Sequence, residues 1–438
     1  MFKRYVFTML LVIAALAIAG LGGCSPASVD NNDEQVDAPS QEAPANAAVT
    51  EFPVAALRPD QVPALDENPI LDAAHWMEQF PYQTSSFLAD RESREKKNYL
   101  EIYPFLNTIF AGSRFAEAYY SPLPHDYAVE HVKTTPRLTD GHPAACFSCK
   151  TPDYPIMEAA DPAAMWSRGF YEVDNQMNST ITCYDCHRNT PGRGVEGDSP
   201  FDGGFIGSIR PHLREWDGGI RPATAACAQC HNEYYFDPET RQATLPPGFT
   251  DPETIFEYYN SINFDDHVSP NTGTGLLKVQ HPEWQHLEGS IHQRRGMTCV
   301  DCHTVRSSSD GQGGFITNHA ITTPSANEEV LQSCTSCHRG GTSGVLRLIQ
   351  ETQESSKTRT DALGENIADF QIRFAAAINA ENLNDSQISE LQALEREMVW
   401  FFDWVFSDNG NGVHNYEGNH RWLSRSEEAL GKANALLP

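Results

Sequence analysis

Five Cys-x-x-Cys pairs are the residues of this chain whose types and spacing most directly indicate chemistry. In four of them the next residue is His, as CYDCH, CAQCH, CVDCH and CTSCH. Two thiols followed directly by His form the attachment motif of c-type haem, in which the thiols bind the porphyrin and the His ligates iron. The matching residues are Cys183, Cys186 and His187; Cys227, Cys230 and His231; Cys299, Cys302 and His303; and Cys334, Cys337 and His338.

Zinc sites also use Cys pairs, but zinc gives no reason for His to follow directly in all four. We therefore expect haem at these motifs. The chain holds 16 histidines, so a second His is available for the far side of each iron. Two His ligands saturate the iron and favour electron transfer over substrate binding.

The fifth pair, Cys146 and Cys149 in ACFSCKTPD, is followed by Lys150 instead of His. An amine ligates iron only after it loses its proton. A haem with a different proximal ligand is a natural candidate for a different task, because an open sixth position would admit substrate. The alternatives are a degenerate electron-transfer haem and a Cys pair without haem.

Composition excludes several classes of protein. The chain has 438 residues and a net charge of −28, so we expect no nucleic-acid binding, which needs a basic face. Aromatic residues make up 10% of the chain, which excludes disorder for most of it. Ten of the 11 cysteines lie in the five pairs and Cys24 stands alone. The chain is therefore not a disulfide scaffold.

The N-terminal stretch MFKRYVFTMLLVIAALAIAGLGGCSP has a basic start, an apolar run and small residues before Cys24. It resembles a bacterial lipoprotein signal, with residues 1–23 removed and Cys24 lipidated. An ordinary signal peptide and an uncleaved anchor are the alternatives. Residues 24–66 predict a flexible acidic tether rich in Ala and Pro. We expect an exported protein, in the periplasm or on an outer face of the cell envelope, lipid-anchored to a membrane.

The distribution of Gly and Pro and the spacing of apolar residues predict a mainly α protein around these motifs. Residues 67–340 hold all five Cys pairs, and their scattered Gly and Pro indicate short helices and long loops around five haems, without obvious continuous strands. Residues 341–438 indicate long C-terminal helices, with apolar residues at helical spacing and a cap at Asn384 or Asp385. This spacing fits a hairpin packed on its own domain and a helix-mediated dimer equally well. The apolar positions are Leu363, Ile367, Phe370, Phe374 and Ala377, then Leu391, Leu394, Met398, Phe401 and Val405.

One CxxCK followed by four CxxCH motifs, on a chain of this length, resembles the pentahaem ammonia-forming cytochrome c nitrite reductases over roughly residues 67–438. Further stretches support the resemblance: QFPYQTSSF (79–87), CAQCHNEYYF (227–236), LKVQHPEW (277–284), SIH (290–292), TNHA (317–320) and GVHNYEG (412–418).

The resemblance implies five covalently bound haem c groups and a calcium ion. It implies Lys150 as proximal ligand of the catalytic haem, with Arg137, Tyr234 and His281 as the other catalytic residues. The implied distal ligands of the other haems are His125, His292, His319 and His414, and His131 lies in the same segment as His125. The implied calcium ligands are Glu233, the carbonyls of Tyr234 and Lys278, and Gln280. We interpret His75, His142, His212, His267, His286 and His420 as surface or structural residues.

The resemblance also implies the six-electron reduction of nitrite to ammonium, fed by the four bis-histidine haems. Arg137 and His281 would donate to the nitrite oxygens, and Tyr234 would donate hydrogen bonds or protons to later species. The implied partners are a membrane quinol-oxidising multihaem cytochrome or a periplasmic electron donor, and a second copy in a homodimer. Two alternatives stay open: a multihaem electron-transfer cytochrome, and a reductase whose main substrate is hydroxylamine or sulfite.

Overall fold

The computed structural model describes residues 68–89, 94–187, 210–214, 220, 222–247, 250–304, 306–307, 316–321 and 323–438. The predicted signal peptide (1–23), the predicted lipid site at Cys24 and the predicted tether (24–66) lie outside the described residues. All described residues belong to a single compact unit. No helix in the described part of the chain is long and apolar enough to cross a membrane.

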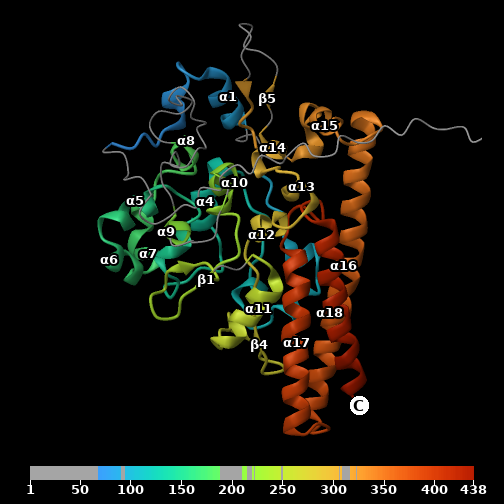
Figure 1. Cartoon of the computed structure of the whole chain (residues 1–438). Coiled ribbons are helices and arrows are strands. Elements are labelled where there is room, and N and C mark those ends of the chain that lie inside the picture. The colour runs from blue at the N-terminus through green and yellow to red at the C-terminus, as the bar shows by residue number, and fades with distance from the viewer. Residues whose placement is uncertain are drawn as a thin grey trace, which may run out of the picture. The chain divides into compact units, whose positions relative to one another are not determined.

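Short helices and long loops make up most of the described chain between residues 68 and 340, as the sequence predicts (Figure 1). The short α-helices are α1 (Pro81–Ala89), α2 (Tyr99–Ile102), α3 (Leu106–Ile109), α4 (Ala128–Lys133), α5 (Asp153–Ala160), α6 (Pro162–Ser167), α7 (Phe170–Val173), α8 (Cys183–Cys186), α9 (Pro211–Arg214), α10 (Pro222–Ala228), α11 (Pro252–Ser261), α12 (Glu283–Leu287), α13 (Ile291–Arg294), α14 (Cys299–His303) and α15 (Glu328–Cys334). Short 3₁₀ helices lie between them, among them η5 (His125–Tyr127) and η6 (Ala144–Phe147).

The described strands form three antiparallel hairpins of two residues a side. They pair β1 (Tyr235–Phe236) with β2 (Ala243–Thr244), β3 (His267–Val268) with β4 (Gly275–Leu276), and β5 (Arg306–Ser307) with β6 (Ile316–Thr317). The mainly α fold class is therefore confirmed. Strands this short cannot build a sheet with a core of its own. The hairpins therefore only connect neighbouring loops through a few backbone hydrogen bonds.

Two of the Cys pairs open helices that their own sequence caps. In T-C-x-D-C-H the Thr occupies the N-cap and the Asp lies three residues later, which is the spacing of a capping box. Asp185 accepts a hydrogen bond from the backbone N–H of Thr182 at 2.7 Å, and Asp301 accepts one from that of Thr298 at 2.7 Å. These caps fix the turn that presents both thiols and the following His.

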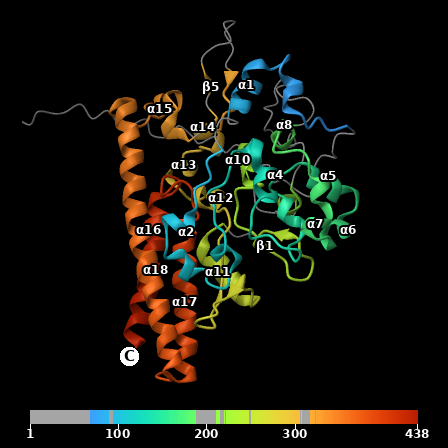
Figure 2. The ribbon, with the colours of Figure 1, turned by 180° about the vertical axis from the view of Figure 1, so that it is seen from behind.

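Three long helices follow: α16 (Gly341–Asn379), α17 (Asp385–Phe406) and α18 (Tyr416–Leu436). They pack against one another, and the chain reverses direction from each to the next (Figures 1 and 2). Asn384 caps α17 through a capping box with Gln387. The predicted apolar positions lie inside this bundle, with all but the half-buried Leu394 fully buried. These stripes are therefore used within the chain and are not free to contact a second copy.

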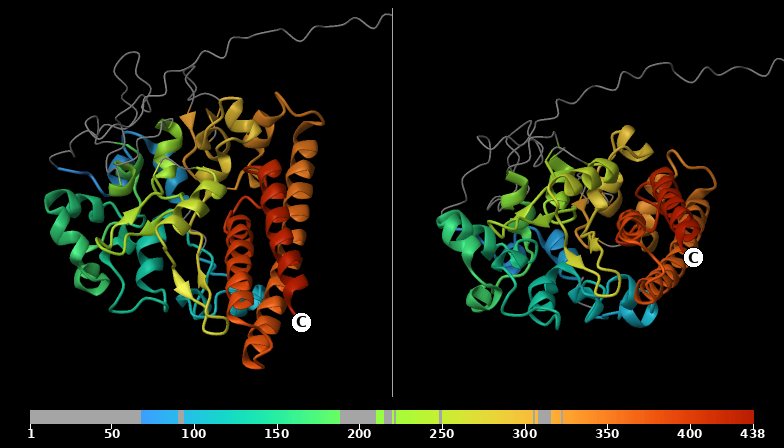
Figure 3. Two further views of the ribbon diagram at one scale, coloured as in Figure 1. Left: turned by 60° about the horizontal axis from the view of Figure 1, so that its bottom comes forward. Right: turned by 90° about the horizontal axis from the view of Figure 1, so that it is seen from below.

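The main hydrophobic core joins this bundle to the region of the Cys pairs. It includes Trp400 and Trp404 of α17, Phe110 after α3, and Leu277 and Val279 of the loop after β4. Seen from below, the green and yellow-green segments that hold the first three Cys pairs lie to one side of the three helices (Figure 3). A second cluster, which includes Phe147, Tyr154 and Phe170, surrounds the Cys146 motif.

Candidate multihaem site

Four pairs of histidine rings face one another across a gap of nearly constant size. Two imidazoles that bind one metal through nitrogens about 2 Å away have ring centroids roughly 6 Å apart. Each pair joins a His that follows a Cys pair to one of the four His implied as distal ligands. The centroid distances are 6.1 Å for His187 and His319, 6.2 Å for His231 and His125, 6.2 Å for His338 and His292, and 6.3 Å for His303 and His414.

This spacing fits the insertion of an iron between the rings, and the Cys residues beside them fit thioether formation, because all ten described cysteines are free thiols. His131 does not face His231. Its Nδ1 instead accepts a 3.4 Å hydrogen bond from the backbone N–H of Leu123. The ring of His281, a predicted catalytic residue, lies 6.4 Å from that of His231. His231 therefore has two neighbouring rings at similar distances, because His125, the predicted distal ligand, lies 6.2 Å away.

Contacts between thiols give the order of the five motifs in space. Cys149 hydrogen-bonds to Cys230, and Cys227 hydrogen-bonds to Cys299. Cys334 adds to the effect of burial that raises the pKa of Cys302 to about 12. The two hydrogen bonds and the effect of Cys334 place four motifs in a row. The row begins at the Lys150 motif, continues through CAQCH and then CVDCH, and ends at CTSCH. The CYDCH motif lies beside the CAQCH motif of this row, because the charge of Cys230 adds to the effects that raise the pKa of Cys186.

The four residues predicted to be catalytic converge on the Lys150 motif. Burial lowers the pKa of His281 to about 3, and the charge of Lys150 adds to this effect. Burial raises the pKa of Tyr234 well above its ordinary value, with Cys149 and Cys146 contributing and Arg137 opposing. Arg137, Tyr234, His281 and Lys150 therefore lie around one Cys pair, although they come from four separate segments.

Arg137 is held by aromatic and backbone contacts. Its guanidinium lies 4.4 Å from the centroid of the Phe115 ring and donates a 3.3 Å hydrogen bond from Nη1 to the carbonyl of Ala118. Burial lowers the pKa of Arg137, while Tyr119 and Tyr234 oppose the shift. Since an arginine stays protonated in proteins, this site carries a fixed positive charge. The guanidinium has five N–H donors, more than its hydrogen bond to Ala118 uses.

The stretch LKVQHPEW supplies His281 on a loop that is tied to the CAQCH motif. The backbone N–H of His281 donates to the carbonyl of Asn232 at 3.3 Å, and that of Trp284 donates to the carbonyl of His231 at 3.1 Å. Glu283 lies with Oε2 3.6 Å from His231 Nδ1. Although burial alone would raise the pKa of Glu283, His231 and His281 hold it well below its ordinary value.

The predicted calcium ligands also come together. Glu233 is buried and accepts hydrogen bonds from the backbone N–H of Gln280 at 2.7 Å and from the Tyr259 hydroxyl at 3.0 Å. The side chain of Gln280 reaches the carbonyl of Lys278 at 2.9 Å. Burial raises the pKa of Glu233 well above its ordinary range, and raises that of Asp266 to about 7.

This group of residues fits a cation. Glu233, Asp266 and Asp403 are buried carboxyl groups, and the ammonium of Lys278 is the positive charge that lies among them. Among the described residues no three His, Cys, Asp or Glu side chains form a metal cluster. A hard cation would therefore rely on the backbone and amide oxygens, which suit calcium.

Several residues near these sites are missed by the sequence patterns. His212 and His286, interpreted as surface or structural, are both buried; His212 stacks on Tyr234 with centroids 6.3 Å apart. Asp408 accepts from His414 Nδ1 at 2.5 Å, and His414 and His286 hold the pKa of Asp408 down against the effect of burial. The contacts of His212 with Tyr234 and of His286 with Asp408 join separate segments, so a local motif cannot reveal them.

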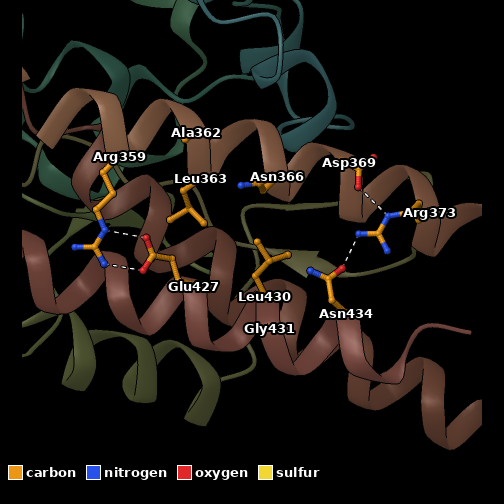
Figure 4. Close-up of a pocket in the computed structure, with 10 residues that line it drawn as sticks. All are labelled: Arg359, Ala362, Leu363, Asn366, Asp369, Arg373, Glu427, Leu430, Gly431 and Asn434. Atoms are coloured by element: carbon orange, nitrogen blue, oxygen red, sulfur yellow. Dashed lines mark hydrogen bonds and ion pairs between the residues drawn. The ribbon is translucent and has the colours of Figure 1, made fainter. Parts of the chain in front are cut away.

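A groove of about 420 Å³ lies between α16 and α18 (Figure 4). Arg359 donates to both carboxylate oxygens of Glu427 at 2.8 and 2.7 Å across it. Arg373 donates to Asp369 at 2.8 Å and to Asn434 at 2.5 Å. None of the residues that line the groove belongs to the predicted haem or calcium sites.

The chain shares its fold with a solved structure and matches a known family. The cytochrome c nitrite reductase of Desulfovibrio desulfuricans, whose catalytic subunit has two calcium sites, superposes with a TM-score of 0.72 at 22% identity over 84% of this chain and 86% of that one. Two other cytochromes superpose less well. The outer cell wall cytochrome OcwA gives a TM-score of 0.39 at 20% identity over 70% and 48% of the two chains. The undecahaem S-layer cytochrome of Carboxydothermus ferrireducens gives 0.35 at 15% over 72% and 41%. The family model of cytochrome c552 matches residues 72–438, and the chain belongs to the cytochrome c552 family.

Proposed function

We propose that this protein is an ammonia-forming nitrite reductase with five covalently bound haem c groups. The observation that carries the proposal is the convergence of Arg137, Tyr234 and His281 on the one Cys pair that is followed by Lys150. A fixed positive charge and hydrogen-bond donors beside a haem with an open position would suit a small anion. Membership in the cytochrome c552 family and the fold shared with a nitrite reductase support the same activity.

The chain's own residues would bind and orient nitrite and deliver protons. The guanidinium of Arg137 supplies fixed positive charge and hydrogen bonds to the nitrite oxygens, which gain charge as the nitrogen–oxygen bonds break. The imidazole of His281 supplies a second donor, and the hydroxyl of Tyr234 a third. Conversion of nitrite to ammonium takes six electrons and eight protons and releases two waters, so a relay of donors around the substrate is needed.

The haem groups would be held by the five Cys pairs. The proposed proximal ligands are Lys150, His187, His231, His303 and His338, and the proposed distal ligands are His319 for His187, His125 for His231, His414 for His303 and His292 for His338. When bound, the haems would supply one-electron redox centres along the row of Cys motifs. The near-constant ring spacing of the four His pairs supports this assignment.

A calcium ion would be held by Glu233, the carbonyls of Tyr234 and Lys278, and Gln280. It would neutralise buried carboxylates and fix the two loops that carry Tyr234 and His281. The proposal also includes export, a lipid anchor at Cys24, electron delivery from a membrane multihaem cytochrome or periplasmic donor, and a homodimer. Ile372 on α16, which is 60% exposed, is an apolar residue that a second copy would cover.

The experiment compares two arginine variants of the haem-loaded protein with a reduced viologen as donor. Arg137→Gln is expected to lose about a hundredfold in kcat/KM for nitrite, the usual effect of removing one preorganised donor. Arg114→Gln, which removes an exposed arginine paired with Glu117, is expected to match the wild type. Both variants should retain full haem content. Equal rates in the two variants would contradict the proposed site, and reducible haems without nitrite loss would favour an electron-transfer cytochrome.

A further inference from the structure

The loop between α17 and α18 holds a buried carboxylate against one of the proposed iron ligands. Asp408 is 1% exposed and lies two residues beyond the end of α17. His414 Nδ1 donates to its Oδ1 at 2.5 Å. The side chain of His414 is itself 22% exposed, whereas that of Asp408 has no exposure.

The loop is built to hold this contact. Asp408 also accepts from the backbone N–H of Gly410 at 3.1 Å and from that of Gly412 at 3.4 Å. Gly410 leaves room for the ring, because a Cβ there would lie 2.6 Å from His414 Nδ1. On its other side Asp408 Oδ2 lies 3.7 Å from His286 Nδ1. The stack of His286 on Trp404, with centroids 5.4 Å apart, fixes that side of the carboxylate.

Two other proposed ligands have weaker partners. Glu283 is 3.6 Å from His231 Nδ1, which is too long for a hydrogen bond. His319 Nδ1 lies 2.8 Å from the carbonyl of Thr317, which is a neutral acceptor. The imidazole of His414 therefore has a carboxylate within hydrogen-bond distance, which these two ligands lack.

We propose that Asp408 is a positioning residue that lowers the reduction potential of the haem held by His303 and His414. The inference rests on the haem attachment in the proposed function. A carboxylate that accepts from the outer ring nitrogen makes the inner nitrogen a stronger donor to the metal. A buried negative charge also favours the more positive, oxidised iron, because the interior screens it poorly.

The position of this haem among the others suggests what a lowered reduction potential would do. The thiol contacts place its motif between that of His231 and that of His338. With haem bound, a lowered potential at this position would favour onward transfer of an electron to a neighbouring haem over its retention, with no bond made or broken. Asp408 thus keeps the middle of the row from trapping electrons.

The test is a potentiometric titration of the full haem-loaded chain, followed by optical and electron paramagnetic resonance spectra. Asp408→Asn keeps an oxygen for His414 and Gly410 but removes the charge. The expected result is an upward shift of one midpoint potential, with the other haems unchanged and all low-spin signals retained. Glu417→Gln, which removes a charge of a 79% exposed side chain near His414, is the matched control and is expected to shift the potentials less.

A midpoint that moves no more in Asp408→Asn than in Glu417→Gln would overturn the inference, and so would an equal shift of every haem. If the Asn variant does not load haem, Asp408→Glu and Asp408→Gln provide a pair of equal length that differs in charge. The Glu variant should then have the lower midpoint, and equal midpoints would overturn the inference. A wild type with fewer than five haems by mass would instead contradict the proposed function.

Discussion

The buried ion pair between Lys278 and Asp403 gives the sharpest prediction about stability. Lys278 Nζ lies 2.9 Å and 3.1 Å from the two carboxylate oxygens of Asp403, and the two side chains are 2% and 0% exposed. Asp403 also accepts from the backbone N–H of Val279 at 2.8 Å. It therefore ties α17 to the loop that would hold calcium and His281.

Asp403→Asn is expected to leave the buried Lys278 ammonium without the carboxylate that bonds it directly. Breaking a buried pair from one side costs about 3–5 kcal/mol. We expect about 3 kcal/mol, the lower end, because Lys278 Nζ keeps the carbonyl of Val279 at 2.7 Å and the hydroxyl of Ser407 at 3.2 Å. Calcium affinity should fall as well, since the Lys278 loop loses its tie to α17.

The assay is urea denaturation followed by tryptophan fluorescence, which bound haem quenches in the folded state. The matched control is Asp369→Asn, which breaks the Asp369–Arg373 pair at 2.8 Å. Those side chains are 65% and 45% exposed, so the expected cost is about 0–1 kcal/mol. The double variant Lys278→Met with Asp403→Leu should recover much of the lost stability. A loss for Asp403→Asn no larger than that of Asp369→Asn would refute the reasoning.

Three further predictions follow from single residues. Lys150→His should keep haem at its Cys pair but reduce nitrite turnover, and unchanged turnover would remove the special role of lysine. In calcium-free protein, the contribution of Asp266 to stability should fall as pH rises from about 4 to about 7, because the folded state holds the proton of Asp266, whose pKa is raised to about 7, where the unfolded chain has lost it. Denaturation of the wild type and of Asp266→Asn at several pH values checks this, because the stability difference between the two should change over that range, and a constant difference would contradict the assignment. Gly364→Ala should destabilise by about 1–3 kcal/mol, because its Cβ would lie 2.6 Å from the Phe105 ring. Gly431→Ala, where a Cβ meets nothing within 4 Å, should stabilise α18 by up to about 1 kcal/mol, and thermal melts that rank the two variants the other way would contradict the packing.

Local patterns predict the parts of the fold that local physics determines. The capping signal at Asn384 and the apolar stripes of α16 and α17 follow from spacing, and the structure has both helices. The helix α18 carries a less regular apolar pattern, and no predicted element marks its bounds. The two-residue hairpins are likewise invisible in sequence, because strands this short have no periodicity to read.

The parts of the candidate site that depend on contacts between distant segments could not be predicted from the sequence. The Cys pairs can be recognised from the sequence alone. That the ring of His187 lies opposite that of His319 depends on the packing of two loops, which the sequence does not show.

In sequence, Asp403 and Asp408 resemble ordinary polar residues at the end of a helix. In the structure both are buried, Asp403 against Lys278 and Asp408 against His286, which lie more than a hundred residues earlier in the chain. Burial of a charge is a tertiary property, so spacing alone cannot predict it.

The most direct test of the central claim is the product of nitrite reduction. Nitrite labelled with ¹⁵N would be given to the purified, haem-loaded protein with a counted supply of reduced viologen, and labelled ammonium would be quantified against nitrite lost. The account predicts one ammonium for each nitrite and six electrons for each turnover, with the rate lost in Arg137→Gln. No loss of nitrite while all five haems remain reducible would contradict it, as would a labelled product other than ammonium.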